Sequence, residues 1–249
     1  MSRLPPLKEL ILSSGLFVPA YALYRLTNRP ERERHARERA FYSSFLAPDS
    51  LVFDVGANIG KKSEVFLEGG ARVVAFEPQA HCVRELIARC APWKSRLATE
   101  QAAVGTEIGE AVLHLRNESS EQASLLADWE GTALAEVRVP VTTLDLAIEK
   151  YGVPDFCKID VEGFELHVLQ GLSQPIPLLS LEYHLREREL QTVRACLERL
   201  SEFGTLSLNV LPASATDWTF PEWLSPERFW DVFPGDLKSE YGDLFVKIS

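Results

Sequence analysis

The sequence has few cysteines, and none is placed for a metal site or a redox pair. Cys82, Cys90, Cys157 and Cys196 form no Cys-x-x-Cys pair, and none has a histidine at zinc-finger spacing. This pattern argues against a structural zinc site. It is typical of reduced, buried thiols in a cytoplasmic enzyme, which is the location that we expect.

Positive charge is also scarce. The 249 residues include 26 Lys and Arg against 36 Asp and Glu, so that the formal net charge is −10 and the isoelectric point is about 5.1. A chain with this balance repels phosphate backbones and anionic lipid surfaces. We therefore expect no nucleic-acid partner.

A long uninterrupted hydrophobic run is missing as well. The apolar stretch at residues 10–26 is broken by Ser13, Ser14, Pro19 and Arg25. It is shorter than the ~20 apolar residues of a membrane-spanning helix, and it lacks the basic start and small-residue cleavage site of a signal peptide. We expect no transmembrane segment. Residues 1–48 are interpreted as an N-terminal helical arm on a domain at residues 49–249.

The sequence does contain an alternation of short apolar runs and helical segments. Residues 51–55 and 72–77 are typical of buried strands, and a helical pattern follows each of them. This rhythm predicts βαβ units and a parallel sheet in an α/β fold. Further strands are expected at residues 101–104, 111–115, 137–141, 156–161, 178–183, 205–210 and 243–248, and further helices at 30–46 and 187–203.

A glycine-rich turn, DVGANIG at residues 54–60, follows the first predicted strand directly. Glycine allows a sharp reversal and a close approach to a ligand, and the next helix offers free N–H groups to an anionic group such as a carboxylate. The spacing Gly-x-x-x-Gly differs from the Gly-x-Gly-x-x-Gly of dinucleotide folds. A pyrophosphate is therefore the less favoured ligand.

Two acidic residues follow later strands. Glu77 ends the second predicted strand, 23 residues after Asp54, close to the separation at which an acid reaches the hydroxyls of a ribose. Asp160, in KIDVEGFE at residues 158–165, falls at the carboxyl end of another strand, where open α/β sheets place their active sites. Asp160 or Glu162 could instead cap the following helix.

These motifs together resemble a known family. DVGANIG, VVAFEP, VPVTTLD and KIDVEGFELHVLQG are similar to the FkbM-type methyltransferases from about residue 51 to residue 183, and the similarity resumes at GDLFVK near the end. The resemblance implies a class I methyltransferase fold. This is a Rossmann-like three-layer sandwich whose seven-stranded sheet is mostly parallel, with an antiparallel C-terminal strand. It also implies S-adenosylmethionine as cofactor and O-methylation of a small molecule, natural product, sugar or glycan.

The resemblance also implies roles for individual residues. Gly56, Asn58 and Gly60 would line the methionine part of the cofactor, with Asp54 supporting their turn. Glu77 would hold the ribose, and Pro78 turns the chain after it. The remaining implied contacts are Ala103 at the adenine, Ser124 as a weaker contact and Asp160 at the sulfonium. Lys61 and Lys62 depart from the family pattern, in which a small or aromatic residue is usual.

A hydroxyl acceptor must lose its proton, which calls for a general base. His184, beside Glu182 in the motif LEYH, is our candidate because a histidine titrates near neutral pH. The alternative is an ordinary hydrogen-bonding histidine. Asp160, Glu162, Glu182 and His184 could bind Mg²⁺ if they converge, but no spacing requires it and we expect no metal.

Residues 217–233 are unusually aromatic, and three interpretations stay open: a substrate lid, a core that covers the sheet edge, or an interface such as that of a homodimer. Two other functions also remain. A nicotinamide-dependent oxidoreductase would share the βαβ start and Glu77, but this sequence lacks the Gly-x-Gly-x-x-Gly spacing of such enzymes. A non-catalytic binding module on the same fold need not have kept Gly56, Glu77 and Asp160 together.

Overall fold

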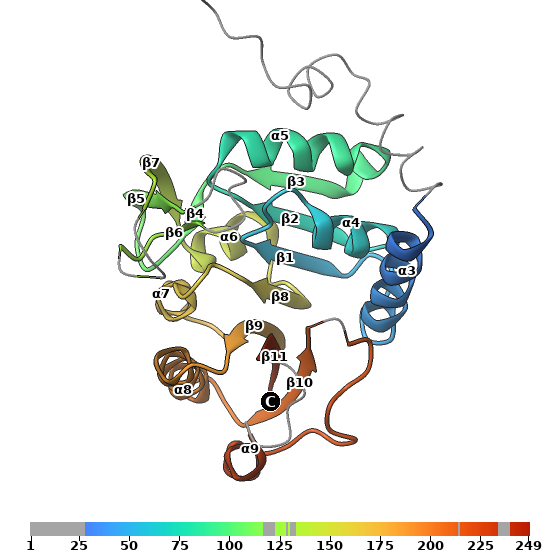
Figure 1. The fold of residues 1–249 in the computed structure, drawn as a ribbon, viewed down its shortest axis with the longest axis vertical. Coiled ribbons are helices and arrows are strands. Elements are labelled where there is room, and N and C mark those ends of the chain that lie inside the picture. Colours follow the sequence, from blue (N-terminus) through green and yellow to red (C-terminus); the bar gives the residue numbers. More distant parts are fainter. Residues whose placement is uncertain (1–27, 117–122, 128, 130–132, 214, 234–239) are drawn as a thin grey trace, which may run out of the picture.

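A computed structural model describes residues 28–116, 123–127, 129, 133–213, 215–233 and 240–249. Its centre is a seven-stranded sheet in the order β10-β11-β9-β8-β1-β2-β3 (Figure 1). The strands are β1 (Leu51–Val55), β2 (Arg72–Phe76), β3 (Leu97–Glu100), β8 (Phe156–Ile159), β9 (Leu178–His184), β10 (Leu206–Pro212) and β11 (Tyr241–Ile248). Only β11 among these strands runs against its neighbours, β9 and β10.

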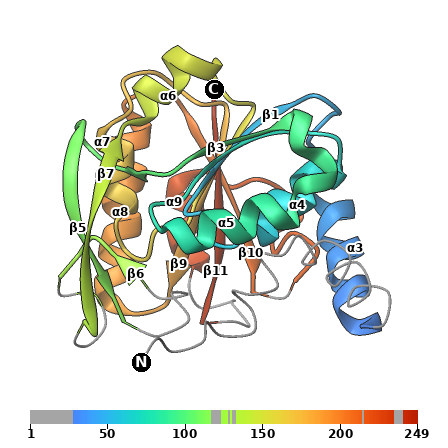
Figure 2. The same cartoon turned by 90° about the horizontal axis from the view of Figure 1, so that it is seen from above.

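Helices cover both faces of this sheet (Figure 2). One face carries α3 (Arg29–Ser43), α4 (Lys61–Glu68) and α5 (Ala80–Arg89), and the other carries α6 (Leu144–Tyr151), α7 (Glu165–Gln170) and α8 (Glu187–Ser201). The three layers and the single reversed strand confirm the class I methyltransferase fold expected from the sequence.

Strand β1 is apolar along most of its length because both of its faces are buried. Phe53 and Val55 pack into the core under α6, α7 and α8, whereas Val52 packs into the core under α3, α4 and α5. Such two-sided burial is typical of inner parallel strands. On α5 the buried stripe runs through Leu86, whereas the next residue, Ile87, is 48% exposed.

A second, four-stranded sheet follows the third strand of the main sheet. Its strands are β4 (Ala103–Val104), β5 (Gly109–Leu115), β6 (Ala123–Ser124) and β7 (Ala135–Thr142), in the order β4-β7-β5-β6. The strand predicted at residues 101–104 is confirmed only at Ala103–Val104, which belongs to the small sheet, and the prediction missed Leu97–Glu100, the edge strand of the main sheet. Edge strand β3 is only half-buried and half-polar, so that it lacks the apolar run of an inner strand.

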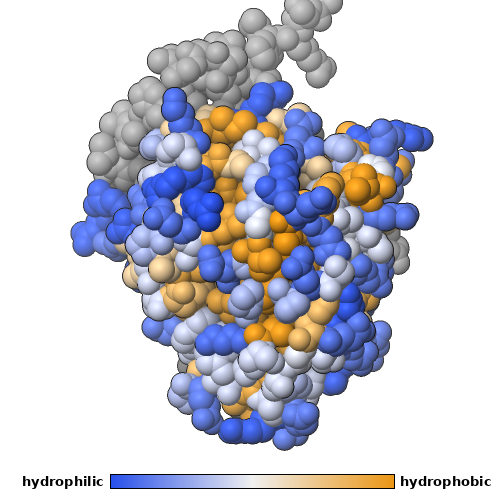
Figure 3. Space-filling model, turned by 180° about the vertical axis from the view of Figure 1, so that it is seen from behind, coloured by the Kyte–Doolittle hydropathy of each residue, from blue (hydrophilic) through white to orange (hydrophobic). Residues whose placement is uncertain are grey.

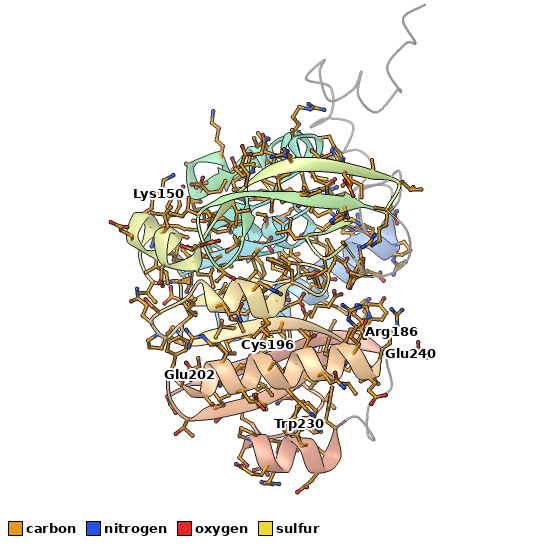
Figure 4. All side chains as sticks on the ribbon, turned by 90° about the vertical axis from the view of Figure 1, so that its left-hand side faces the viewer. Lys150, Arg186, Cys196, Glu202, Trp230 and Glu240 are labelled. Atoms are coloured by element: carbon orange, nitrogen blue, oxygen red, sulfur yellow. The ribbon has the colours of Figure 1, made fainter. Side chains whose placement is uncertain are left out.

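The aromatic segment closes the edge of the main sheet at β10. Thr219 N donates to Val210 O at 2.9 Å, and Leu224 forms a bridge with Leu208. Phe220, Phe229 and Phe233 join one core, and Trp218 and Trp223 pack against the other. Trp230, on α9 (Pro226–Val232), lies towards α8 (Figure 4), where the Arg194 guanidinium stands 3.7 Å from its ring centre. Of the three interpretations, the rings therefore fit the sheet-edge core.

Helix α3 lies in the described part of the predicted arm, residues 28–48, whereas residues 1–27 lie outside the described residues. Its N-cap is Asn28, whose side chain accepts from Glu31 N at 3.3 Å, and Pro30 stands in its first turn. Phe41 and Tyr42 are buried in the core that α4 shares. None of the helices in the described ranges is both long and apolar enough to cross a membrane.

Hydrophobic residues reach the surface in a band on the face opposite to that of Figure 1, between hydrophilic margins (Figure 3). Large exposed apolar side chains also occur on and beside the small sheet, where Ile108 is 67% and Leu134 68% exposed. A homodimer remains a prediction.

Candidate active site

A cavity of about 200 Å³ opens where β1, β2 and β8 end. Its wall contains eight of the residues that the sequence singled out: Gly56, Asn58, Glu77, Pro78, Ala103, Asp160, Glu162 and Glu182. It also contains Val55, Phe76, Gln79, Ala102, Val104, Leu113, Ala123, Leu125, Val161 and Phe164. Asp54, Gly60, Ser124 and His184 are not part of this wall. The carboxyl edge of the sheet thus gathers most, but not all, of the candidates.

The turn after β1 is built from left-handed backbone. Gly56 has φ of 81°, Asn58 of 49° and Gly60 of 79°. A Cβ at Gly56 would lie 1.8 Å from the Asp160 carbonyl oxygen, so that only glycine lets this turn pass the loop after β8. Gly60 has a different place: it is the N-cap residue of α4, and a Cβ there would lie 2.8 Å from Leu86. Its geometry serves helix packing.

Asp54 lies beneath the turn and ties β1 to α4. Its side chain is buried, and its Oδ2 accepts a hydrogen bond from Ser63 Oγ at 2.6 Å. Burial raises the pKa of Asp54, while Lys158 and the Ser63 hydrogen bond act against that rise. This position agrees with a supporting role rather than a direct contact with a ligand.

Glu77 joins the first two βα turns. Its Oε2 accepts from Asn58 N at 2.9 Å and its Oε1 from Gln79 N at 2.8 Å. Burial raises the pKa of Glu77 to about 7, although both backbone hydrogen bonds favour the ionised form. The carboxylate is therefore fixed in place at the end of β2, and each oxygen keeps a lone pair for a ligand hydroxyl.

Asp160 is held by a buried lysine. Lys158 Nζ, in a side chain that is only 3% exposed, donates to Asp160 Oδ2 at 2.6 Å. Burial favours the neutral acid, but Lys158 outweighs it and lowers the pKa of Asp160. For Lys158, burial favours the neutral amine, but Asp160, Asp243 and Asp54 raise its pKa. Asp160 thus faces the cavity as a carboxylate.

Two side chains fix the loop after Asp160. Ser124 was a predicted cofactor contact, and Glu165 was not. Glu165 Oε1 accepts from Val161 N and Gly163 N, each at 3.2 Å. Ser124 Oγ, buried in the small sheet, donates to Glu162 O at 2.7 Å. The structure therefore gives Ser124 contact with this loop, outside the cavity wall. Burial and the neighbouring Glu182 and Asp160 raise the pKa of Glu162 to about 9.

Glu182 and His184 lie at the end of β9 and differ in the spaces that they line. Glu182 lines the cavity and also a much smaller space of about 20 Å³ beside it, whereas His184 lines only the smaller of the two. Glu182 Oε2 lies 3.5 Å from His184 Nε2. Burial and Asp160 raise the pKa of Glu182 to about 7, with His184 opposing them. The pKa of His184 is raised by Glu182.

Glu162, Glu182 and His184 are the described residues that could hold a metal ion, because one ligand atom from each lies within 4.8 Å of the others. These are three of the four candidates named from the sequence. The fourth, Asp160, is engaged by Lys158.

Comparison with known proteins identifies the family. A family model, the methyltransferase FkbM domain, matches residues 54–205, which contain the glycine turn, Glu77, Asp160 and Glu182. The chain belongs to the FkbM methyltransferase family. It is therefore a methyltransferase that depends on S-adenosylmethionine. No curated protein sequence matches this FkbM methyltransferase significantly.

Solved structures with similarity to this FkbM methyltransferase share little sequence with it. The O-methyltransferase from Bacillus cereus in complex with SAH is 14% identical with a TM-score of 0.46, over 95% of this chain and 89% of that one. A precorrin-6Y C5,15-methyltransferase from Geobacter metallireducens GS-15 is 11% identical with a TM-score of 0.45, over 86% of each chain. Aeropyrum pernix fibrillarin with bound S-adenosyl-L-methionine is 8% identical with a TM-score of 0.43, over 81% of this chain and 67% of that one.

The cavity of this FkbM methyltransferase fits its cofactor in charge. Four acidic side chains line it (Glu77, Asp160, Glu162 and Glu182), and none of the described residues lining it is a lysine or an arginine. Such a wall suits the sulfonium and ammonium groups of S-adenosylmethionine and opposes a pyrophosphate. Glu77 would hold the ribose, Asp160 the positive groups and the apolar residues Ala103 and Leu113 the adenine. A nicotinamide dinucleotide is correspondingly disfavoured.

Several wall residues were not found from the sequence. Gln79 could have been, because it directly follows Glu77 and Pro78 at a strand end. Leu113, Ala123 and Leu125 could not, because only the folded position of the small sheet brings them to the cavity.

Glu77→Gln is expected to weaken S-adenosylmethionine binding roughly 10- to 100-fold, because a charged acceptor for the ribose hydroxyls is lost while the side-chain shape remains. Isothermal titration of the folded variant measures this, with the exposed Glu107→Gln as the matched control. Unchanged affinity in Glu77→Gln would remove Glu77 from the cofactor site.

Proposed function

We propose that this FkbM methyltransferase transfers the methyl group to a hydroxyl oxygen of a small-molecule or glycan acceptor, with Glu182 as the general base. One observation carries the proposal: Glu182 lies on the cavity wall, where burial and then Asp160 raise its pKa to about 7. A base is most effective when its pKa lies near the working pH. Transfer to oxygen needs such a group, because an alcohol must give up its proton.

Asp160 and Glu182 have different roles in the proposed reaction. S-adenosylmethionine, when bound, supplies a methyl group on a positively charged sulfur. Asp160, kept ionised by Lys158, offers this positive charge a fixed negative partner. Glu182 takes the hydroxyl proton while the acceptor oxygen gains the methyl group and the sulfur keeps the electron pair of the broken bond. The products are the methyl ether, S-adenosylhomocysteine and protonated Glu182.

His184 has a positioning role in this proposal. Its Nε2 stands 3.5 Å from Glu182 Oε2, and its ring stacks on Tyr241 at 5.7 Å between ring centres. Because His184 is outside the cavity wall, it acts on the acceptor only through Glu182. We therefore propose Glu182 as the general base in place of His184, which was the candidate from the sequence.

Transfer of a labelled methyl group tests the proposal. The enzyme, S-adenosylmethionine with a ¹³C methyl group and a panel of hydroxylated acceptors are incubated, and the product is examined by NMR. The expected product is a methyl ether, recognised by the shift of its methyl carbon. A label found only on nitrogen or carbon would contradict transfer to oxygen.

The rate should depend on pH through Glu182. At saturating S-adenosylmethionine, which removes the effect of Glu77 on binding, log kcat is expected to rise with a slope of one up to about pH 7 and then level off. The base works only when deprotonated, and its deprotonated fraction falls tenfold per pH unit below its pKa of about 7. A kcat that is flat between pH 5.5 and 8 would exclude Glu182.

The cluster of Glu162, Glu182 and His184 favours one alternative, a metal-assisted transfer. In our proposal Glu182 must take a proton, and we therefore expect kcat to survive dialysis against EDTA unchanged. Mass spectrometry of the metal content before and after dialysis is the control. Loss of activity that Mg²⁺ restores would make Glu182 a metal ligand instead of the base.

A further inference from the structure

A second cavity, of about 220 Å³, adjoins the first. It lies between α3 and the ends of β8, β10 and β11, and its wall includes Asp160 and Glu182, which also belong to the wall of the cofactor cavity. The two spaces therefore meet at these two carboxyl groups. A methyl acceptor has to approach the cofactor from a space that reaches this junction, and the second cavity does so.

Two polar groups on the second cavity's wall have no partner in the described part of the chain. Tyr42 is 2% exposed, and its hydroxyl makes no hydrogen bond with the described residues. The carboxyl group of Asp243 likewise has neither a hydrogen bond nor an ion pair there. Tyr42 and Asp243 line the same cavity, and burial and then the charge of Asp243 raise the pKa of Tyr42. Buried polar groups usually have partners, so that the unpartnered Tyr42 hydroxyl indicates a ligand, with the half-buried Asp243 on the same wall.

The charges around this cavity are unequal. Each cation has an acidic partner: Lys62 lies 3.1 Å from Glu38, Lys158 lies 2.6 Å from Asp160, and Arg34 lies 2.6 Å from Glu31. Asp243 has no such partner, although Lys158 and Lys62 act on it from a distance. Glu182 interacts with His184 and has a side-chain hydrogen bond with Asp160. The charge left without a close partner on this wall is therefore negative, which favours a ligand that brings a positive charge.

We propose that the second cavity binds the methyl acceptor, and that this acceptor is a small hydroxyl compound with an ammonium group, such as an amino sugar. The ammonium would bind Asp243 and donate to the Tyr42 hydroxyl, and the reacting hydroxyl would face Glu182. The size agrees, because the cavity lies below the ~300–1,000 Å³ of pockets for drug-sized ligands and holds about one sugar ring. The inference rests on the proposed transfer to oxygen.

Binding of two matched probes tests the proposal. Methyl 2-amino-2-deoxy-α-D-glucopyranoside and methyl α-D-glucopyranoside differ only in an ammonium in place of a hydroxyl. On enzyme saturated with S-adenosylhomocysteine, titration followed by NMR should show the amine bound roughly tenfold more tightly or better, as expected for a charge-assisted hydrogen bond. Equal affinity, a preference for the neutral probe, or no binding of either would overturn the proposal.

Two variants test which side chains cause the preference for the amine probe. Asp243→Asn keeps the side-chain shape, and it should reduce the preference for the amine to near one while leaving the affinity for S-adenosylhomocysteine unchanged. Tyr42→Phe should weaken binding of the amine and keep the fold, because the buried ring remains. The exposed Asp217→Asn is the control and should change neither probe.

A preference that survives Asp243→Asn would also overturn the proposal. The proposed transfer to oxygen fails on a different result, a labelled methyl group found elsewhere than on oxygen, so that the two failures are distinguishable.

Discussion

Glu182→Gln is expected to lower kcat by roughly 10²–10⁴-fold, the usual contribution of a general base, while the affinity for S-adenosylmethionine stays at the wild-type value. Glutamine keeps the size of the side chain and its place on the cavity wall, but it cannot take the proton of the acceptor. The pH dependence below about pH 7 should disappear from the residual rate, because the group that titrates there is gone. Steady-state kinetics at saturating cofactor measure both effects.

Two further variants make this result specific. His184→Ala should lower kcat less than Glu182→Gln, because His184 only holds Glu182 from outside the cavity. Glu202→Gln, at the exposed end of α8 (Figure 4), should have no effect. If His184→Ala lost as much activity as Glu182→Gln while Glu182→Gln kept its pH dependence, the histidine would be the base.

Lys158→Met is expected to destabilise the fold by about 3–5 kcal/mol, because it leaves the buried Asp54 and the half-buried Asp160 without their cation. Lys158 is 3% exposed, and Asp160, Asp243 and Asp54 all act on it. For a domain of this size the loss corresponds to a decrease of roughly 6–20 °C in Tm. Thermal unfolding followed by circular dichroism measures it.

The pH dependence of this loss has a definite sign. Without Lys158 the pKa values of the buried carboxyl groups should lie above those of the unfolded chain. Such groups cost no stability below the unfolded pKa of about 4 and cost more as the pH rises. The difference in Tm from the wild type should therefore shrink between pH 7 and pH 5.

An exposed pair provides the matched control. Lys150 lies 2.6 Å from Glu100, the same distance that separates Lys158 from Asp160, but its side chain is 60% exposed. Lys150→Met should therefore leave Tm nearly unchanged, since water replaces the lost partner. Equal decreases in both variants would mean that burial of Lys158 is not what makes its pair matter.

The sequence predicted the parts of the site whose geometry is local. Gly56 was found because a sharp turn after a buried strand demands glycine, and Glu77 and Asp160 because they are acids at strand ends of a parallel sheet, whereas Asn58 came from the family resemblance. The layers and the reversed strand followed from the motifs of the family.

What the sequence could not predict depends on contacts between distant segments. Gly60 belongs to the same motif as Gly56, but Leu86 from another helix occupies the space beside it. Ser124 and His184 are next to the cavity without lining it, and this distinction rests on side-chain direction. The edge strand β3 has no apolar run to reveal it. The second cavity combines α3 with the last strand, so that Tyr42 and Asp243 show no pattern in the sequence.

Isothermal titration with S-adenosylmethionine, S-adenosylhomocysteine and NAD tests the central claim most directly, namely that an acidic cavity at the ends of β1, β2 and β8 binds the methyl donor. We predict saturable 1:1 binding of the first two ligands, weakened by Glu77→Gln, and no binding of NAD. Binding of NAD in preference to S-adenosylmethionine, or binding of S-adenosylmethionine that Glu77→Gln leaves intact, would contradict the account.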